Sequence, residues 1–412
     1  ISQRYINGIM FRPKVVSAFL QQIQKTYENN GYPFCRVSLD SIVIINEELH
    51  ATIRIEKHHL LRFSKIHLVG NPLLSQRLVS SYTQIKKGNL FDQSKVNLIS
   101  DRIKQLGFVE EAKQAELLFT IEGVEVFLYL KSKPVSLING IIGFQPDPIN
   151  NKLSLTGELR LKLVNILRKA EVIDFNWRSI RAETQALKAN IILPNLFQTP
   201  FGVNSQFSLY KRDSSFLELK ATVGIQYAMK NGNYLKFFYR RLSSSVLGGG
   251  ASNPSFSNLN SVESNYYGLA LSKQTLDYLP NPRKGSRFFL ESTVGKRTVT
   301  DTSLLNNSTT FKGELRFELY LPLAKRHVLK LANYTEVFLA PSYFQNEVYR
   351  FGGQLTLRGF REEELNATSR SVGTIEYRFL LDKNSNLFAF FDQAWYENKS
   401  GNSLLSDTPY GF

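Results

Sequence analysis

The stretch LSLTGELRLKL, residues 153–163, alternates apolar and polar side chains over its whole length. Leucine takes every second position except Gly157, and the positions between carry serine, threonine, glutamate, arginine and lysine. Because successive side chains of a β-strand point to opposite faces, the pattern predicts a strand with one apolar and one charged face. The same alternation recurs in LELKATVGIQY (217–227) and GELRFELYL (313–321).

About thirteen segments with this alternation follow Pro134. A soluble sandwich or propeller would bury the apolar face, but segments of 11–15 residues exceed both the usual soluble strand of about 5–6 residues and the roughly 9–11 that cross a bilayer. The polar connection 246–263 is long and its neighbours are tight, an asymmetry typical of outer-membrane barrels. We therefore predict an all-β antiparallel transmembrane barrel. Its strands are expected near 135–145, 152–165, 170–181, 184–194, 202–212, 215–229, 233–245, 264–274, 286–297, 309–322, 326–340, 368–380 and 386–397.

Composition argues against several other classes of protein. The chain has 412 residues, a net charge of +16 and a single cysteine, Cys35, which is expected to be a small buried hydrophobe. Basic residues are spread along the chain, which favours a solvated or lumen-facing surface over nucleic-acid binding. No apolar run is long enough for a transmembrane helix. No histidine spacing, catalytic triad, P-loop or carboxylate pair indicates a metal, a cofactor or an enzyme.

Residues 1–132 mix helical and strand patterns in two units. The second unit has the order strand, helix, helix, strand, strand, and Asp92 is placed to cap its second helix. The first unit has the same ending but lacks an obvious first strand. The elements are expected at 13–30 (helix), 35–44 and 49–57 (strands), then 62–70 (strand), 72–84 and 92–106 (helices), 116–121 and 124–131 (strands).

The segment RFGGQLTLRGFREEEL, residues 350–365, fits neither a helix nor a clean strand. Its glycines permit tight turns and a close approach to a wall. Arg358 offers five donors in a rigid fork, so inside a barrel it needs carboxylate partners. The acidic run 362–364 is expected to be a solvated face rather than a metal site. The alternative for the whole segment is a glycine-rich extracellular turn with an incidental salt bridge.

GGQLTLRGF (352–360) resembles the signature of the BamA/TamA superfamily, outer-membrane proteins with periplasmic POTRA modules ahead of a barrel. GYPF (31–34) and LINGIIGFQPDP (137–148) resemble the same family, particularly its versions from Bacteroidetes-type bacteria. The resemblance covers nearly the whole chain. The implied domains are a partial POTRA module at 1–60, a POTRA module at 61–132, and a barrel at 133–412 with an in-folding loop at 341–366.

Two acidic side chains are placed to bind Arg358. In GTIEYRF (373–379), Glu376 alternates with apolar residues and is expected to face the lumen. In LFAFFDQAW (387–395), Asp392 interrupts an aromatic run where a lipid-facing carboxylate would be costly. Both match acidic positions that hold the loop arginine in the family. We predict that Arg358 bridges them and pins the loop. The motif residues are Gly352, Gly353, Leu357, Arg358, Gly359 and Phe360.

Family barrels have sixteen strands, whereas this sequence shows thirteen segments and the start of a fourteenth at 410–412. We expect the closing strands to follow Phe412, because an open edge in lipid would leave backbone groups unsatisfied. Phe412 is then not a C-terminal assembly signal. Further POTRA residues are expected ahead of Ile1.

With no chemistry evident, function is expected to come from shape. A POTRA sheet edge accepts an extended peptide by β-augmentation. The first barrel strand carries Asn139, Gly140 and Gly143, and its glycines weaken pairing, so the seam at this strand is expected to open sideways. The resemblance implies an outer-membrane protein assembly factor, or insertase, in a Gram-negative-type bacterium, with its POTRA modules in the periplasm.

The partners implied by the resemblance are unfolded outer-membrane or secreted client polypeptides, periplasmic or lipoprotein accessory subunits, and outer-membrane lipid and lipopolysaccharide. The alternative is a two-partner-secretion-type transporter for a dedicated polypeptide, which normally carries a plugging helix; none is visible in 1–11. A barrel enzyme would need a catalytic cluster near its extracellular loops. A passive porin would not need the N-terminal modules.

Overall fold

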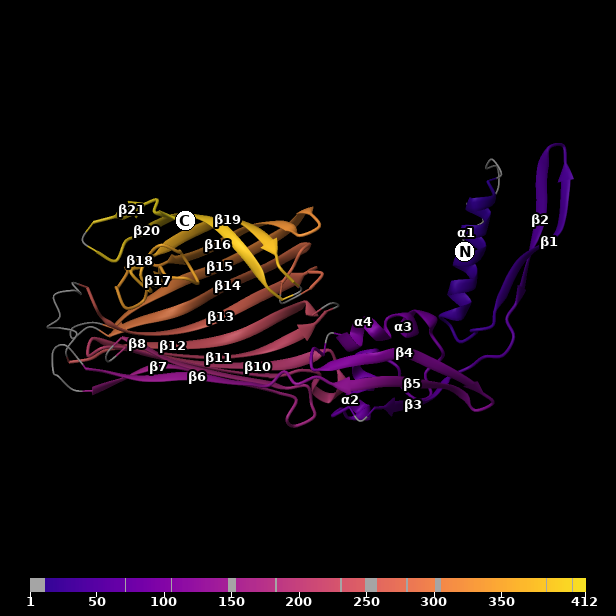
Figure 1. Cartoon of the computed structure of the whole chain (residues 1–412), viewed down its shortest axis with the longest axis horizontal. Helices are drawn as coiled ribbons and strands as arrows, with labels where there is room; N and C mark the ends of the chain where they lie inside the picture. The colour runs from indigo at the N-terminus through magenta and orange to yellow at the C-terminus, as the bar shows by residue number, and fades with distance from the viewer. Residues whose placement is uncertain are drawn as a thin grey trace. The chain divides into compact units, whose positions relative to one another are not determined.

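The computed structural model describes residues 12–70, 72–104, 106–146, 153–181, 184–229, 232–248, 258–278, 281–300, 305–382, 384–401 and 403–412. The chain divides into two units, Ile1–Pro134 and Val135–Phe412, shown from indigo to purple and from magenta to yellow in Figure 1. None of the described helices has the length and apolar character needed to cross a membrane. Parts of the quoted segments 137–148 and 246–263 lie outside the described residues.

The first module contains α1 (Pro13–Glu28) and the antiparallel strands β1 (Arg36–Ile45) and β2 (Glu48–Glu56). All three predicted elements are present within two residues of their expected ends. Gly31 follows the helix with a φ of 98°, and a Cβ at this position would lie 2.6 Å from Leu60 Cδ1. Only glycine fits there without displacing a neighbour.

Cys35 ends the GYPF turn and is 2% exposed. Burial, together with the charge of Glu28, raises the pKa of its thiol, so the thiolate is disfavoured at neutral pH. The prediction of a buried hydrophobe is confirmed. Beside it, the Phe34 ring lies 4.8 Å from the ring of Phe119 in the second module, which links the two modules within this unit.

The second module is a three-stranded sheet with helices on it. The strand order is β3-β5-β4, with β3 parallel and β4 antiparallel to β5. Its buried core is apolar and includes Phe63, Val79, Phe91, Ile103, Val126 and Leu128. The elements are β3 (Phe63–Val69), α2 (Gln76–Thr83), α3 (Gln93–Asn97), α4 (Ile99–Lys104), β4 (Val109–Thr120) and β5 (Gly123–Ser132).

Three boundaries in this module differ from the prediction. Helix α2 begins at Gln76 instead of residue 72, because the Ser75 hydroxyl caps it by accepting the Leu78 N–H at 3.2 Å. The helix predicted over 92–106 is split into α3 and α4, although Asp92 caps it as expected by accepting the Ser94 N–H at 3.0 Å. Strand β4 starts at Val109 instead of residue 116, since pairing with β5 extends it where the sequence shows no alternation.

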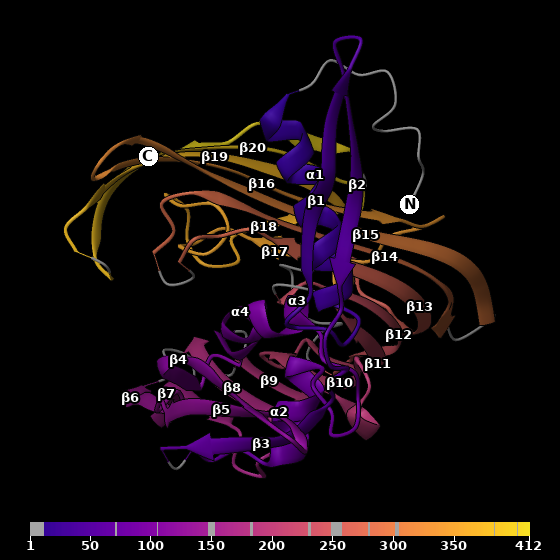
Figure 2. The same ribbon diagram turned by 90° about the vertical axis from the view of Figure 1, so that its right-hand side faces the viewer.

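The second unit is one curved antiparallel sheet (Figures 1 and 2). All thirteen predicted segments are strands, each paired with its neighbours in chain order. Two short strands that both pair with β20 follow them. The strands are β6 (Leu137–Pro146), β7 (Leu153–Val164), β8 (Val172–Arg181), β9 (Thr184–Leu193), β10 (Phe201–Arg212), β11 (Phe216–Ala228), β12 (Tyr234–Val246), β13 (Ser261–Gln274), β14 (Gly285–Thr300), β15 (Leu305–Ala324), β16 (His327–Leu339), β19 (Ser369–Leu380), β20 (Asn386–Asn398), β21 (Leu405–Asp407) and β22 (Tyr410–Gly411).

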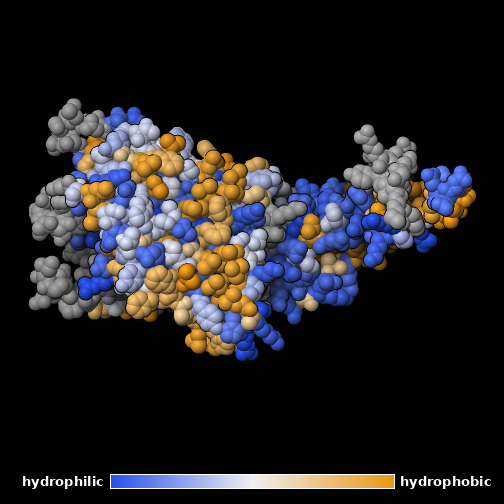
Figure 3. Space-filling model, turned by 90° about the horizontal axis from the view of Figure 1, so that it is seen from above, coloured by the Kyte–Doolittle hydropathy of each residue, from blue (hydrophilic) through white to orange (hydrophobic). Residues whose placement is uncertain are grey.

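The sheet has its apolar face outside and its polar face inside. In β11, Val223 is 55% exposed and Ile225 57%, whereas Thr222, directly before Val223, is 2% exposed. Figure 3 shows apolar side chains gathered in broad patches on the outer face of this unit. The predicted alternation is therefore confirmed, with the orientation that a transmembrane barrel requires.

The interior is occupied by the chain between β16 and β19. This segment forms a small ribbon of β17 (Tyr349–Phe351) and β18 (Leu365–Ala367), which was not predicted and which lies within the curve of the sheet (Figure 2). The sheet runs from β6 at one edge to β21 and β22 at the other, and within the described residues no strand pairs across these two edges. The expectation of about sixteen strands stays a prediction.

Candidate functional site: the loop inside the barrel

Glycines shape the backbone of the loop 341–366. Gly352, Gly353 and Gly359 have φ values of 111°, 91° and 92°, a region that side chains other than glycine rarely adopt. A Cβ on Gly352 would lie 2.5 Å from the carbonyl oxygen of Arg361, and one on Gly353 would overlap the Glu362 carboxylate. The two arms of the loop therefore run close together only because glycine is present.

The structure brings Arg358 together with both predicted acidic partners. Its Nε and Nη2 donate to the two carboxylate oxygens of Asp392, each at 2.7 Å, and its Nη1 donates to Glu376 Oε2 at 2.8 Å. The backbone N–H of Arg358 donates to the same Asp392 carboxylate at 3.2 Å. The three side chains are 16%, 2% and 5% exposed, so this is a buried, two-pronged ion pair rather than an incidental surface contact.

Neighbouring side chains complete this arrangement. The Thr374 hydroxyl donates to Asp392 at 2.8 Å, and Arg378 Nε donates to Glu376 at 2.6 Å. The Phe390 ring lies under the Arg358 guanidinium, 3.5 Å from ring centroid to Cζ. Sequence reasoning missed Phe390, although it shares the inward face of β20 with Asp392 and could have been found from that alternation.

The apolar residues of the motif hold the loop by packing. Leu357 is fully buried with Phe351 from β17 and Tyr396 from β20, and Phe360 packs against the same cluster. On the other side, Gly411 in β22 lies so close to the Arg358 carbonyl that a Cβ there would overlap it. The motif is thus enclosed by β19, β20 and β22.

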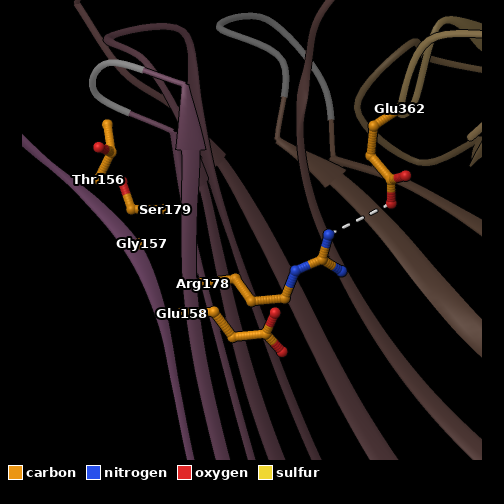
Figure 4. Close-up of a pocket in the computed structure, with 6 residues that line it drawn as sticks. All are labelled: Thr156, Gly157, Glu158, Arg178, Ser179 and Glu362. Carbon is orange, nitrogen blue, oxygen red and sulfur yellow. Dashed lines mark hydrogen bonds and ion pairs between the residues drawn. The ribbon is translucent and has the colours of Figure 1, made fainter. Parts of the chain in front are cut away.

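The prediction of a solvated face for 362–364 holds for Glu364, which is exposed, but not for Glu362 and Glu363, which are half-buried and bind the barrel wall. Glu362 lies 3.4 Å from Arg178 in β8, as Figure 4 shows, and Glu363 accepts a hydrogen bond from the Tyr210 hydroxyl in β10 at 2.6 Å. The cause is tertiary: the loop crosses the interior, so residues that follow Arg358 reach the opposite wall. No local pattern in the sequence shows this.

Two further ion pairs hold the arm that enters the interior. Arg297 in β14 is fully buried, and its Nε and Nη2 donate to Glu347 at 2.9 and 2.5 Å. Arg350 lies 3.6 Å from Glu218 in β11. Sequence reasoning did not find either pair, because the partners of each lie far apart in the chain.

The predicted seam residues Asn139, Gly140 and Gly143 lie in β6, away from the Arg358 cluster. They pair with Arg160, Leu159 and Thr156 of β7. The opposite side of β6 is the sheet edge, where Ile138 and Ile141 are each 77% exposed. The structure therefore places these residues at one edge of the sheet.

Within the part of the chain that the structure describes, no three His, Cys, Asp or Glu side chains form a group that could hold a metal ion. The site is instead a set of permanent charges in fixed pairs. Its geometry can position a loop and join strands.

No family model and no curated protein match this chain. Solved structures do. CdiB from Acinetobacter baumannii has a TM-score of 0.59 and 13% identity, covering 98% of this chain and 76% of that one. CdiB from Escherichia coli has a TM-score of 0.58 and 14% identity, covering 97% and 78%. BamA from Haemophilus ducreyi lacking POTRA domains 1-3 has a TM-score of 0.52 and 15% identity, covering 94% and 82%.

The chain therefore shares the fold of these CdiB and BamA structures. The aligned part, which is 94–98% of this chain, includes residues of both the N-terminal modules and the curved sheet. Identities of 13–15% establish this likeness at the level of the fold.

Proposed function

We propose that this protein is an outer-membrane protein assembly factor, which receives unfolded barrel clients at its POTRA modules and inserts them at a lateral seam beside β6. We further propose that it acts without catalytic chemistry or a cofactor. Client folding would then supply the energy. The membrane is the outer membrane of a Gram-negative-type bacterium, with the modules on the periplasmic side.

One observation supports the lateral route: the interior is occupied by the loop 341–366. The loop 341–366 is bound to strands on several sides of the interior, which obstructs a straight path through it. Strand β6 is the first strand of the sheet and carries Gly140 and Gly143, which weaken its pairing. A weakly paired strand at the seam could open and act as a template for an incoming strand.

The POTRA modules offer a binding site for a client before it reaches the barrel. Strand β4 is an edge of the three-stranded sheet, and most of its side chains are exposed or half-buried. An extended client segment could add to this edge by main-chain hydrogen bonds before it reaches the barrel.

The second candidate is a two-partner-secretion-type transporter of a dedicated polypeptide. The two CdiB structures, with TM-scores of 0.59 and 0.58, are the observation in its favour. BamA at 0.52 is close to these values, and fold likeness alone does not separate the two functions.

Depletion of the protein followed by quantitative proteomics of the outer membrane separates them. An assembly factor predicts a broad loss of unrelated barrels, restored by the parent gene. Loss of one or a few exported proteins with barrels unchanged would contradict the proposal and support the transporter. The Glu263→Gln variant, which loses one half-exposed ion pair, serves as the matched control. Its expression in the depleted cells should restore the barrels as well as the parent protein does.

A further inference from the structure

The loop 341–366 binds two regions of the sheet that are far apart in the chain. Its Arg358 binds β19 and β20, whereas Glu362 and Glu363, only a few residues later, bind β8 and β10. Arg178 and Glu362 are 184 residues apart in sequence. The loop therefore connects the strands near one sheet edge with the strands near the other.

The attachments to the body of the sheet are buried. Arg358 makes two 2.7 Å hydrogen bonds to Asp392, which is 2% exposed, and Arg297 and Glu347 are 0% and 1% exposed. Breaking a buried pair leaves an uncompensated charge and is strongly unfavourable. These contacts fix the loop to β14, β19 and β20.

The ion pair that attaches the loop to β8 is more open to water. Arg178 and Glu362 are both 30% exposed and lie 3.4 Å apart. They line a pocket of about 390 Å³ together with Thr156, Gly157, Glu158 and Ser179, as Figure 4 shows. A hydrated ion pair of this kind holds weakly and exchanges readily with water.

We infer that Glu362 and Glu363, with Arg178 and Tyr210, form a releasable latch between the loop and the N-terminal strands. When the strands near β6 move away from the rest of the sheet, this latch opens first. The loop stays with β14, β19 and β20. The purpose of the movement, lateral opening, rests on the proposed function, but the movement itself needs no client.

Three distances between paired spin labels test this in lipid vesicles. The labels go on the Cys35→Ala background at Leu159 on the outside of β7, Phe391 on the outside of β20, and Leu355 in the loop, which are 38%, 43% and 79% exposed. The latch is opened by Glu362→Gln with Glu363→Gln, which keeps side-chain size. Glu263→Gln, whose partner Arg241 is 61% exposed, is the matched control.

The latch variant should increase the population of longer distances by about 2- to 5-fold in both pairs that include Leu159. The Leu355 to Phe391 distance should not change, because that end of the loop is fixed. The control should match the parent in all three. Unchanged distances in every pair, or a longer Leu355 to Phe391 distance with the Leu355 to Leu159 distance preserved, would overturn the inference.

Two further measurements keep the outcome interpretable. If the double variant fails to fold, Arg178→Gln removes the same ion pair from the other side and should give the same shift in direction. Client insertion by the parent is measured separately. A latch that opens in a protein without insertion activity would contradict the proposed function and not the latch.

Discussion

The POTRA unit and the barrel unit differ in the side chains that they bury. The second module encloses Phe91, Val126 and Leu128, each at most 1% exposed. The barrel also encloses charged side chains such as Arg297 and Asp392, at 0% and 1%, and exposes Val223 and Ile225 on its outer face, at 55% and 57%. Both units obey the same alternation along their strands, so the difference lies in the solvent that each outer face meets.

This contrast determines what holds each unit together. In the module, removal of apolar surface from water is the main stabilising term. In the barrel, the outer face contacts lipid, and the interior is organised by paired charges and hydrogen bonds around the loop. Loss of an apolar side chain should therefore destabilise the module most. Loss of a paired charge on the inner face should destabilise the barrel most.

The largest effect is expected inside the barrel. Asp392→Ala leaves Arg358 buried without its two-pronged partner, a change that costs about 3–5 kcal/mol. The barrel should unfold at a lower urea concentration, followed by the fluorescence of its two tryptophans, Trp177 and Trp395, in detergent micelles. Arg241→Ala, which removes a half-exposed pair, should change stability by only about 0–1 kcal/mol. Equal midpoints for these two variants would contradict the anchoring role.

Leu128→Ala in β5 tests the apolar core of the module. Loss of this buried side chain should destabilise the module by about 2–5 kcal/mol. Hydrogen exchange in the full chain should accelerate over β3, β4 and β5, and the tryptophan signal of the barrel should stay at the parent midpoint. Ile121→Ala, at a fully exposed position, is the control and should leave exchange unchanged. A shift of the barrel midpoint would show that the units are not independent.

Val223→Arg tests the outer face of the barrel. Val223 is 55% exposed near the middle of β11, and a charge facing lipid at mid-depth costs about 2–4 kcal/mol. Gln206→Arg adds the same charge on the inner face of β10 and should cost much less. The yield of folded barrel in vesicles measures both. Similar losses for the two would mean that the faces are assigned incorrectly.

The smallest effect is expected at a helix cap in the module. Asp92→Ala removes the acceptor for the Ser94 and Lys95 N–H groups and should cost about 1 kcal/mol. Hydrogen exchange should accelerate at the start of α3 only. Asp92→Asn retains an acceptor and should exchange like the parent. Loss of the whole module would mean that Asp92 does more than cap a helix.

The strands of the barrel could be predicted because alternation is a local signal. Each of the thirteen segments carries its own two-residue period, and this survives in the structure. The Arg358 contacts could also be predicted, since Glu376 and Asp392 sit at inward positions of their strands and match acidic positions of the family that the sequence resembles.

The remaining features depend on how distant segments meet. The Arg178–Glu362 contact exists only because the loop crosses the interior, and the Arg297–Glu347 pair depends on the same path. The early start of β4 at Val109 comes from pairing with β5. None of these contacts produces a local sequence pattern. For this reason the sequence alone predicted a solvated face at 362–364.

The most direct test of the account is photocrosslinking from the edge of β6 while a barrel client is being assembled. A photoreactive residue at Ile138 or Ile141 should crosslink to the client, and one at Leu269, which is 54% exposed but in the middle of the sheet, should not. Crosslinks from Leu355 inside the barrel, with none from β6, would contradict lateral insertion and indicate passage through the interior.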